Sequence, residues 1–315
     1  MKSSLPILVC LAAIACGQAV RAQPAAAQSA PGAQGANASV PGGDALIEQV
    51  VRSVAAAPSI SAKLRHRVEL LDRTLLGTGV YLQQGRGDER KFRLEMELRT
   101  VLFATQVQHV CDGSRLWTLE ELDGNRDLGT VDLVRLRRGQ PSSKGQPPSP
   151  TMWLSLGGLP RLLVHLQEAF VFDKVVESNL DDLCVLSVEG KWTRGKLAAW
   201  LPDQRQAIEK GEQPNLGPLT PNVPHRVVLH VGCDDRFPYR IEYWGPADGQ
   251  GGAEKLMVVL ELYEVQIDAP VDPAQFVFQP PEGVTPRDRT DEYMRRFGVE
   301  DPPISEATRR RRFRR

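Results

Sequence analysis

The sequence lacks long apolar runs and is poor in cysteine. Beyond its first residues, no stretch approaches the ~20 consecutive apolar residues that a membrane-spanning helix needs. Of five cysteines, only Cys111, Cys184 and Cys233 lie outside the N-terminal segment. An odd number excludes a full disulfide framework, although one bridge among these three can form in an oxidising compartment. The sequence therefore predicts a fold held mainly by its hydrophobic core.

Motifs for catalysis and metal binding are missing as well. The chain has no G-x-S-x-G, no glycine-rich phosphate loop, no H-E-x-x-H and no paired C-x-x-C. Aromatic residues make up only 6% of the chain and the formal net charge is zero, while 41% hydrophobic and 25% charged residues are typical of a soluble globular protein. These absences predict a protein that is not an enzyme and needs no cofactor and no metal.

The first 22 residues, "MKSSLPILVCLAAIACGQAVRA", have the order of an export signal. Lys2 precedes an apolar run, and small residues precede Gln23, so we expect cleavage after residue 22 and a location in the periplasm or cell envelope. An alternative is a lipid anchor on Cys16, within "AIAC". Residues 23–43 are rich in Ala, Gln, Gly and Pro and carry no charge, which predicts a disordered linker.

After a helix expected from Asp44 as its N-cap to Pro58, apolar and polar residues alternate along several segments. "KFRLEMELR" is the clearest, and turn residues separate it from similar segments before and after it. This pattern predicts an antiparallel meander with one apolar face. A loop is expected at 139–150, followed by a short helix with Pro160 in its first turn.

The stretch "HVCDGSRLW" gathers His109, Cys111, Asp112 and Ser114, and it allows two interpretations. A serine nucleophile would need a histidine base and an orienting acid, and nothing in the sequence specifies such a trio. A metal site of His109, Cys111 and His66 is a further alternative, as is one around "HVGCDD". Asp-Gly between two alternating segments is a strong hairpin signal, so we predict a turn. The five tryptophans are expected in the core or in a cavity wall.

Three phrases in a fixed order carry a resemblance to a known family. A D-G-x-x-L-W turn is followed by a leucine-rich helix after a proline, and then by an F-x-F-x-P-P-x-G-V ending. The matching residues are Asp112, Gly113, Leu116 and Trp117; Pro160, Leu162 and Leu163; and Phe276, Phe278, Pro280, Pro281, Gly283 and Val284. Over residues 44–286 the chain resembles the LolA-like family of periplasmic carriers that sort outer-membrane lipoproteins.

The resemblance implies a mainly β fold with helices: a strongly curved antiparallel sheet, or half-open β-barrel, with helices covering its concave face. Relative to the simple carriers, the chain has inserts at 139–158 and 194–224. The implied partners are the acyl chains of a lipid or lipoprotein, held in a cavity under a lid. The expected cavity residues are Leu64, Val68, Phe92, Leu94, Met96 and Trp117, and the expected lid residues are Leu162, Leu163 and Leu166.

The predicted function is therefore that of an exported, non-enzymatic binder of a hydrophobic ligand, with lipoprotein carriage or sorting as its specific role. The alternative is an envelope-associated structural or interaction protein whose core is filled by its own side chains. Such a protein would bind through its linker and through the C-terminal segment 287–315, where a short helix precedes "RRRRFRR". This basic tail suits an anionic membrane surface or envelope polyanion, and no nucleic acid is expected as a partner outside the cell.

Overall fold

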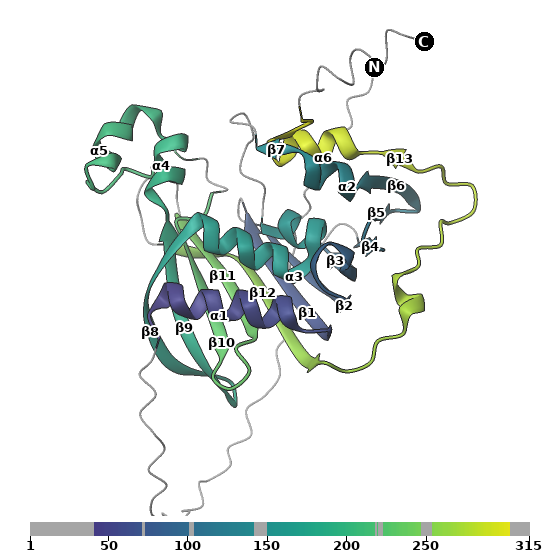
Figure 1. Ribbon diagram of the computed structural model, residues 1–315, viewed down its shortest axis with the longest axis horizontal. Coiled ribbons are helices and arrows are strands. Elements are labelled where there is room, and N and C mark those ends of the chain that lie inside the picture. The colour runs from purple at the N-terminus through teal and green to yellow at the C-terminus, as the bar shows by residue number, and fades with distance from the viewer. Residues whose placement is uncertain are drawn as a thin grey trace, which may run out of the picture.

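The computed structural model describes residues 41–70, 73–100, 104–141, 150–217, 219, 223–246 and 254–302. Its strands follow the segments in which apolar and polar residues alternate (Figure 1). They are β1 (Ser59–Leu70), β2 (Arg73–Gln84), β3 (Lys91–Arg99), β4 (Ala104–Cys111), β5 (Arg115–Leu122), β6 (Asn125–Asp132), β7 (Gln140–Pro141), β8 (Phe170–Leu180), β9 (Leu183–Trp192), β10 (Arg226–Gly232), β11 (Pro238–Pro246), β12 (Glu254–Ile267), β13 (Arg287–Asp288) and β14 (Val299–Glu300).

Short helices and turns connect these strands, and two longer helices cover the sheet. The α-helices are α1 (Gly43–Ala56), α2 (Leu133–Arg138), α3 (Pro150–Ala169), α4 (Arg194–Trp200), α5 (Arg205–Glu209) and α6 (Thr290–Arg296), and the 3₁₀ turns are η1 (Gly87–Glu89), η2 (Pro202–Gln204) and η3 (Pro273–Phe276). Among the described residues, no helix is both long and apolar enough to cross a membrane.

Twelve strands form one sheet, in the order β13-β6-β5-β4-β3-β2-β1-β12-β11-β10-β9-β8. Neighbouring strands are antiparallel except for β13, which is parallel to β6. Because β1 pairs with both β2 and β12, the first and last long strands meet in the middle of the sheet. The prediction of a mainly β fold with helices and an antiparallel meander is therefore confirmed.

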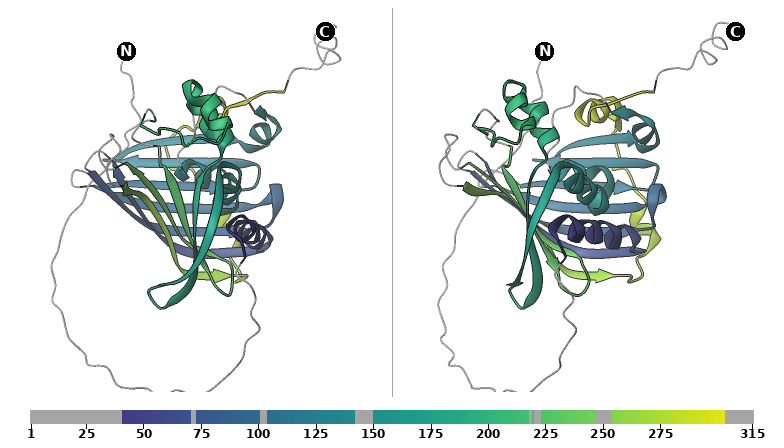
Figure 2. Two further views of the ribbon diagram at one scale, coloured as in Figure 1. Left: turned by 90° about the vertical axis from the view of Figure 1, so that its left-hand side faces the viewer. Right: turned by 60° about the vertical axis from the view of Figure 1, so that its left-hand side comes forward.

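Helices α1 and α3 pack against each other and lie across one face of the sheet (Figures 1 and 2). The predicted helix after residue 43 is present, and its apolar stripe, including Leu46, Val50 and Val54, is buried in the main core. The prediction that Asp44 caps this helix is wrong. The helix already begins at Gly43, and the Asp44 Oδ1 atom instead accepts a hydrogen bond of 2.8 Å from the Phe172 N–H, which ties α1 to β8.

Helix α3 begins earlier than predicted, at Pro150, and is interrupted in the middle. Gly157 and Gly158 leave helical geometry, and Gly158 has φ +69° and ψ −167°, a conformation open essentially to glycine alone. Pro160 then lies in the first turn of the second half, as predicted. The buried Tyr81 hydroxyl accepts the Leu159 N–H at 2.8 Å and donates to Gln83 Oε1, so β2 holds the interruption in place.

The turn at "CDGS" joins β4 to β5, which confirms the hairpin prediction. Asp112 Oδ1 accepts hydrogen bonds from the N–H groups of Ser114 and Arg115 and from the Ser114 hydroxyl, each within 2.9 Å. Gly113 takes φ +101°, a conformation that the glycine supplies without strain. The side chains of His109 and Cys111 point to the same buried face of β4.

Two further segments complete the fold. After β12 the chain crosses the face of the sheet opposite α1 and α3, and on the way Phe276 becomes buried. The chain then reaches β6 through β13. The second expected insert, residues 194–224, carries α4, η2 and α5 around a small core of its own. Figure 1 shows this unit at one end of the sheet, beyond α3.

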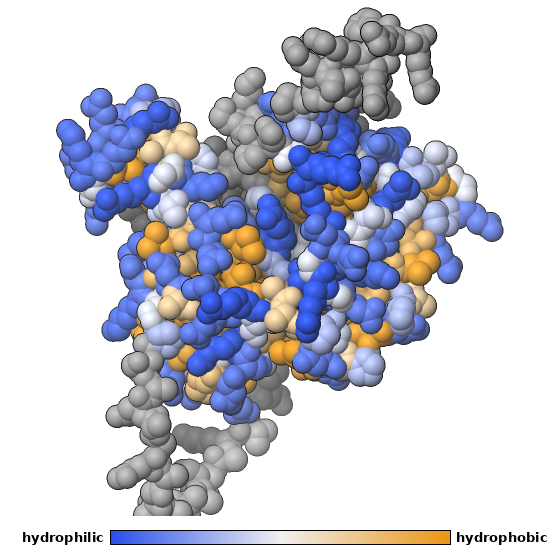
Figure 3. Space-filling model, viewed as in Figure 1, coloured by the Kyte–Doolittle hydropathy of each residue, from blue (hydrophilic) through white to orange (hydrophobic). Residues whose placement is uncertain are grey.

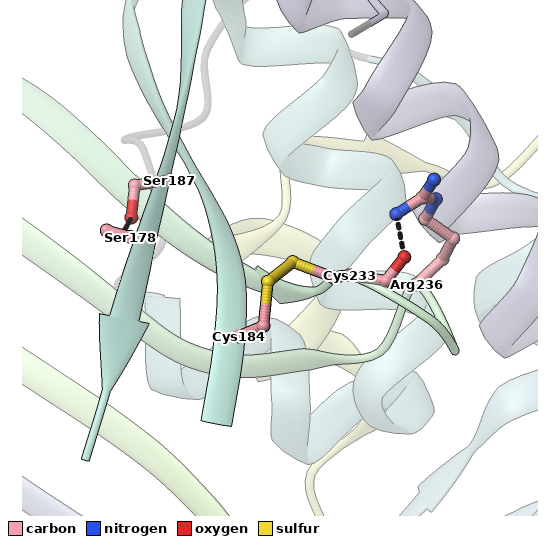
Figure 4. The surroundings of a disulfide bond; sticks show 5 residues. All are labelled: Ser178, Cys184, Ser187, Cys233 and Arg236. Carbon is pink, nitrogen blue, oxygen red and sulfur yellow. Dashed lines mark hydrogen bonds between the residues drawn. A yellow bond between two sulfur atoms is a disulfide. The ribbon is translucent and has the colours of Figure 1, made fainter. Parts of the chain in front are cut away.

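The disulfide that the sequence left open joins Cys184 to Cys233, while Cys111 is free and buried. Cys184 lies near the start of β9, and Cys233 follows the last residue of β10 (Figure 4). The bridge therefore links two neighbouring strands where the β10–β11 turn begins.

Candidate ligand groove

The face of the sheet under α1 and α3 is filled by the protein's own side chains. Seven of the expected cavity and lid residues are buried in this one core: Leu64, Phe92, Leu94, Met96, Leu162, Leu163 and Leu166. Val68 is also buried, but it packs with Leu75 in a separate small cluster further along β1. A small space that Met96 and Leu162 line measures about 10 Å³, room for about one water molecule.

Trp117 does not join this group. Its neighbours Leu116 and Thr118 are buried, and successive side chains of a strand point to opposite faces, so the Trp117 ring lies on the other face of β5. There it stacks on Phe278 with ring centroids 5.1 Å apart. Both partners belong to the phrases that carry the family resemblance, and their contact holds the segment that follows β12 against the sheet.

The small interior space is polar on one side. His66 Nδ1 and the Tyr243 hydroxyl are both buried without a hydrogen-bond partner among the described residues, and both side chains line this space, together with Met96 and Leu154. Burial lowers the pKa of His66 to about 4 and raises the pKa of Tyr243 well above its ordinary value. Both groups are therefore neutral at physiological pH and able to bind one small polar group.

A much larger depression lies beside α3, with a volume of about 770 Å³, within the range of small-molecule sites. We call it the α3 groove. Figure 3 shows hydrophobic residues among hydrophilic ones on the face of the molecule that α1 and α3 cover. Apolar residues from distant parts of the chain line the groove: Trp153, Leu156, Pro160 and Val164 of α3; Ala55 of α1; Phe92 and Cys111 of the sheet; Trp192 and Trp200 around α4; Leu133 and Leu136 of α2; and Phe297 and Val299 near the end.

Aromatic rings form two clusters in the groove wall. The Trp153 ring stacks on His165 at 4.4 Å and meets the edge of Phe297 at 4.7 Å, and its buried Nε1 atom has no partner among the described residues. Trp192 meets the edge of Trp200 at 4.6 Å. The Trp192 and Trp200 rings are partly exposed and offer apolar contact surface to a ligand that lies beside α3, whereas Trp153 is buried at the base of the wall.

The groove also carries charge. Arg90, Arg137, Arg161 and Lys196 line it, against Asp88 and Glu168 as its acids. The His165 imidazole does not add to this charge, because burial, followed by the charges of Lys196 and Arg161, lowers its pKa to about 3. The site thus combines aromatic walls with an excess of cations.

Cys111, which lies in this wall, is not a nucleophile at neutral pH. Burial raises the pKa of its thiol to about 11, and the Gly113 N–H donates to the sulfur at 3.3 Å. A thiol is reactive as the thiolate, which this environment disfavours. The stretch from His109 to Trp117 is therefore a turn between two strands, with its thiol and imidazole packed in the core.

Sequence reasoning missed one polar network, on the opposite face of β8 to β11. Ser187 Oγ lies 2.8 Å from His230 Nδ1 and 2.7 Å from Ser178 Oγ, and His230 Nε2 lies 3.6 Å from Glu242 Oε1 (Figure 4 shows the two serines). Serine, histidine and an acid are the components of a hydrolase triad. However, Glu242 already forms an ion pair with Arg240 at 2.7 Å. Ser187 lies in the middle of β9, which pairs with β8 on one side and β10 on the other. The hydrogen bonds between these strands use the backbone N–H groups that an oxyanion hole would need. The network stabilises the sheet.

The buried imidazoles predict sensitivity to acid. Burial lowers the pKa of His66 and His109 to about 4, with Arg289 adding to the effect at His109, whereas an exposed histidine has a pKa of 6.5. Between these values the unfolded chain binds protons that the folded chain does not. The contribution of these imidazoles to the free energy of unfolding should therefore be complete above pH 6.5 and decrease as the pH falls toward 4.

Urea unfolding at a series of pH values measures this slope. The slope of the unfolding free energy against pH gives the number of protons taken up on unfolding. In His66→Leu this number should be smaller by about one between pH 6 and 4.5, because one buried imidazole has been removed. The same change at the partly buried His225 should decrease the slope by less than His66→Leu does, because burial lowers the pKa of His225 less strongly. An unaltered slope in His66→Leu would contradict the burial argument.

The groove was only partly predictable. Trp153, Trp192 and Trp200 belong to the tryptophans expected in the core or a cavity wall, and they line it. Arg161, Lys196 and Phe297 were not singled out, because each is an ordinary residue in its own segment. The one local signal was the pair Gly157-Gly158 before Pro160, which marks the interruption beside the groove.

No protein-family model matches the sequence, and no curated protein matches it. Solved structures do match. A DUF1329 family protein from Desulfovibrio piger is 13% identical, with a TM-score of 0.32 over 74% of this chain and 96% of that chain. A domain described as an outer membrane lipoprotein-sorting protein, from Vibrio parahaemolyticus, is 7% identical, with a TM-score of 0.32 over 74% and 95%.

The lipoprotein LppX of Mycobacterium tuberculosis also matches, at 9% identity and a TM-score of 0.36 over 73% of this chain and 96% of that chain. TM-scores and identities this low assign no ligand to the chain, so the proposals below rest on its own residues. The structures that match include a lipoprotein-sorting protein domain, the class of protein that the sequence motifs resemble.

Proposed function

We propose that the protein is an exported, non-enzymatic binder of a hydrophobic ligand, namely the acyl chains of a lipid or lipoprotein, with a role in lipoprotein carriage or sorting. The observation that carries the proposal is the α3 groove, about 770 Å³ in volume and walled by Trp153, Trp192, Trp200 and Phe297. Burying one methylene group contributes ~0.8 kcal/mol, so an acyl chain along this wall binds without any catalytic group.

The interruption of α3 gives such a chain a route into the interior. Trp153 and Leu156 face the groove, while Leu154, between them in sequence, lines the small space under the helix. The first half of α3 thus separates the groove from the small interior space. In this proposal the break at Gly157-Gly158 lets the first half of the helix move as a unit. In this proposal the sheet is a half-open barrel, α3 is its lid, and displacement of the lid exposes Leu94, Met96 and their neighbours to the ligand.

A location in the periplasm or cell envelope fits two features. The expected export signal precedes the fold, although it lies outside the described residues. The Cys184–Cys233 disulfide belongs to an oxidising compartment. The protonated thiol of Cys111 and the strand-bound Ser187 support a binding role over a catalytic one.

A second candidate function is that of an envelope-associated interaction protein that binds through its linker and basic tail. The packed interior favours it, since the space between Met96 of the sheet and Leu154 and Leu162 of α3 measures about 10 Å³. The tail and most of the linker lie outside the described residues. The two candidates differ in one measurable property, which is whether the folded part takes up an amphiphile.

Native mass spectrometry of the full-length protein, purified from an exporting bacterial host, tests the first candidate. We expect adducts of lysophosphatidylcholine or co-purified lipid. In Trp200→Ala we expect an affinity about tenfold lower, because a partly exposed ring of the groove wall is lost. Trp244→Ala is the matched control: this ring lies outside the groove, where its Nε1 donates to Glu242. If the spectrum shows only the ligand-free mass, even after addition of lysolipid and acylated peptide, the first candidate function is wrong and the second remains.

A further inference from the structure

The charges that line the α3 groove are not balanced. Four cationic side chains face two carboxylates, while the chain as a whole has no net charge. Two of the cations are already bound within the protein. Arg137 donates to the carbonyl oxygens of Asp88 and Gly113, both at 2.9 Å, and Arg90 donates to the Ala55 carbonyl oxygen at 3.0 Å. Asp88 lies 3.7 Å from Arg137, so one of the two carboxylates is paired within the site.

The other two cations, Arg161 and Lys196, are free to bind a ligand. Both are exposed, and neither forms an ion pair or a hydrogen bond through its side chain within the described part of the chain. Glu168, two turns along α3 from Arg161, is the remaining acid of the groove and leaves this end with an excess of one positive charge. Both cations also lower the pKa of the same imidazole, His165, which lines the groove with them.

Arg161 is held at the groove by its surroundings. Its guanidinium lies 5.1 Å from the centroid of the Trp153 ring, a cation–π contact, and its Cβ packs so closely on Gly157 that an added methyl group there would collide with it. Lys196 lies in the first turn of α4, which Thr193 caps. The two cations thus come from different helices, with the rings of Trp153, Trp192 and Trp200 beside them.

We propose that the α3 groove selects an amphiphile with an anionic head, a phosphate or a carboxylate, which binds to Arg161 and Lys196 while its acyl chain lies against the tryptophans. A guanidinium and an ammonium group donate charge-assisted hydrogen bonds to such oxygens. The inference rests on the proposed function, because it names the class of ligand for the same groove. It differs from any binding by the C-terminal arginines, which lie elsewhere in the sequence.

Two single-chain lipids that differ only in their heads provide the test. Lysophosphatidylglycerol carries a net negative charge and lysophosphatidylcholine carries none, and both are titrated below their micelle concentrations while tryptophan fluorescence of the full-length protein is recorded. We expect lysophosphatidylglycerol to bind about tenfold more tightly at low salt, with the ratio shrinking as salt screens the exposed cations.

In Arg161→Gln/Lys196→Gln the ratio should fall to about one, while the affinity for lysophosphatidylcholine stays within about twofold of the unaltered protein. Lys191→Gln/Arg194→Gln is the matched control, since these exposed cations are close in sequence and do not line the groove. The ratio should survive in this control. Circular dichroism of both variants shows whether the fold is retained, and the comparison of two ligands on one variant does not depend on its stability.

The outcomes separate the two proposals. Equal affinity of the unaltered protein for both lysolipids overturns the anionic selection and keeps the hydrophobic binder. Failure of both lysolipids to bind overturns both proposals. Glycerophosphoglycerol, which is lysophosphatidylglycerol without its acyl chain, should bind far more weakly than the intact lipid. Equal binding would show that the groove binds the anion alone and would overturn the selection of an amphiphile.

Discussion

Replacing Cys184 and Cys233 together by alanine should lower the free energy of unfolding by about 4 kcal/mol. The disulfide closes a loop with a sequence separation of 49 residues, and the restriction of the unfolded chain by a loop of this length is worth about that amount. The folded backbone should change little, because the Cys233 N–H donates to the Cys184 carbonyl oxygen at 3.1 Å and holds the two strands together without the bridge.

Urea unfolding with and without a reducing agent measures the effect. The unaltered protein should lose the same stability on reduction, whereas the double variant should not respond. The free thiol of Cys111 is common to both proteins, so it provides the internal control. Equal unfolding midpoints for the oxidised and reduced protein would show that the bridge does not form in solution, and would remove one of the two supports for an oxidising compartment.

The same bridge shows what sequence reasoning could and could not supply. Three cysteines allow three pairings, and spacing alone does not choose between them. The strand register does: Val185 pairs with Gly232, so the next position outward brings Cys184 opposite Cys233. The register depends on which strands are neighbours, which is a property of the whole sheet.

Local patterns predicted the elements well. Alternation located the strands, and Asp112-Gly113 located a hairpin, because both signals depend on residues next to each other in the sequence. Trp117 shows the limit. Alternation requires Leu116 and Trp117 to face opposite ways, but only the packing of the helices decides which side is the interior. Asp44 was misplaced for a similar reason, since its partner is the backbone of a strand 128 residues away.

The groove depends even more on distant parts of the chain. Trp153 and Arg161 come from α3, Lys196 from α4, and Phe297 from the segment after α6. None of these segments carries a sequence motif that indicates a binding site. The sequence therefore predicted the class of ligand through a resemblance and placed it under α3. The geometry offers a space of about 770 Å³ beside this helix, and the space lined by Met96 and Leu162 measures about 10 Å³.

Leu163→Ala tests whether the interior is packed in solution, and we expect it to cost between about 2 and 5 kcal/mol of unfolding free energy. The Leu163 side chain is 0% exposed, in the core between α3 and the sheet, so its truncation leaves a void. Val176→Ala, on a β8 side chain that is 47% exposed, is the control and should change stability by less than about 0.5 kcal/mol. Urea unfolding of the three proteins gives the comparison.

A cost below about 1 kcal/mol for Leu163→Ala would instead indicate an interior with open space, in which a lid residue touches little. A large cost has a consequence for ligand uptake. An acyl chain that enters under α3 must replace contacts of this strength. At ~0.8 kcal/mol for each buried methylene group, about three to six methylenes offset the packing that one leucine provides. Short chains should therefore stay in the α3 groove, and only a long chain gains enough to enter between α3 and the sheet. The length of acyl chain at which Leu163→Ala begins to bind more tightly than the unaltered protein would locate this transition.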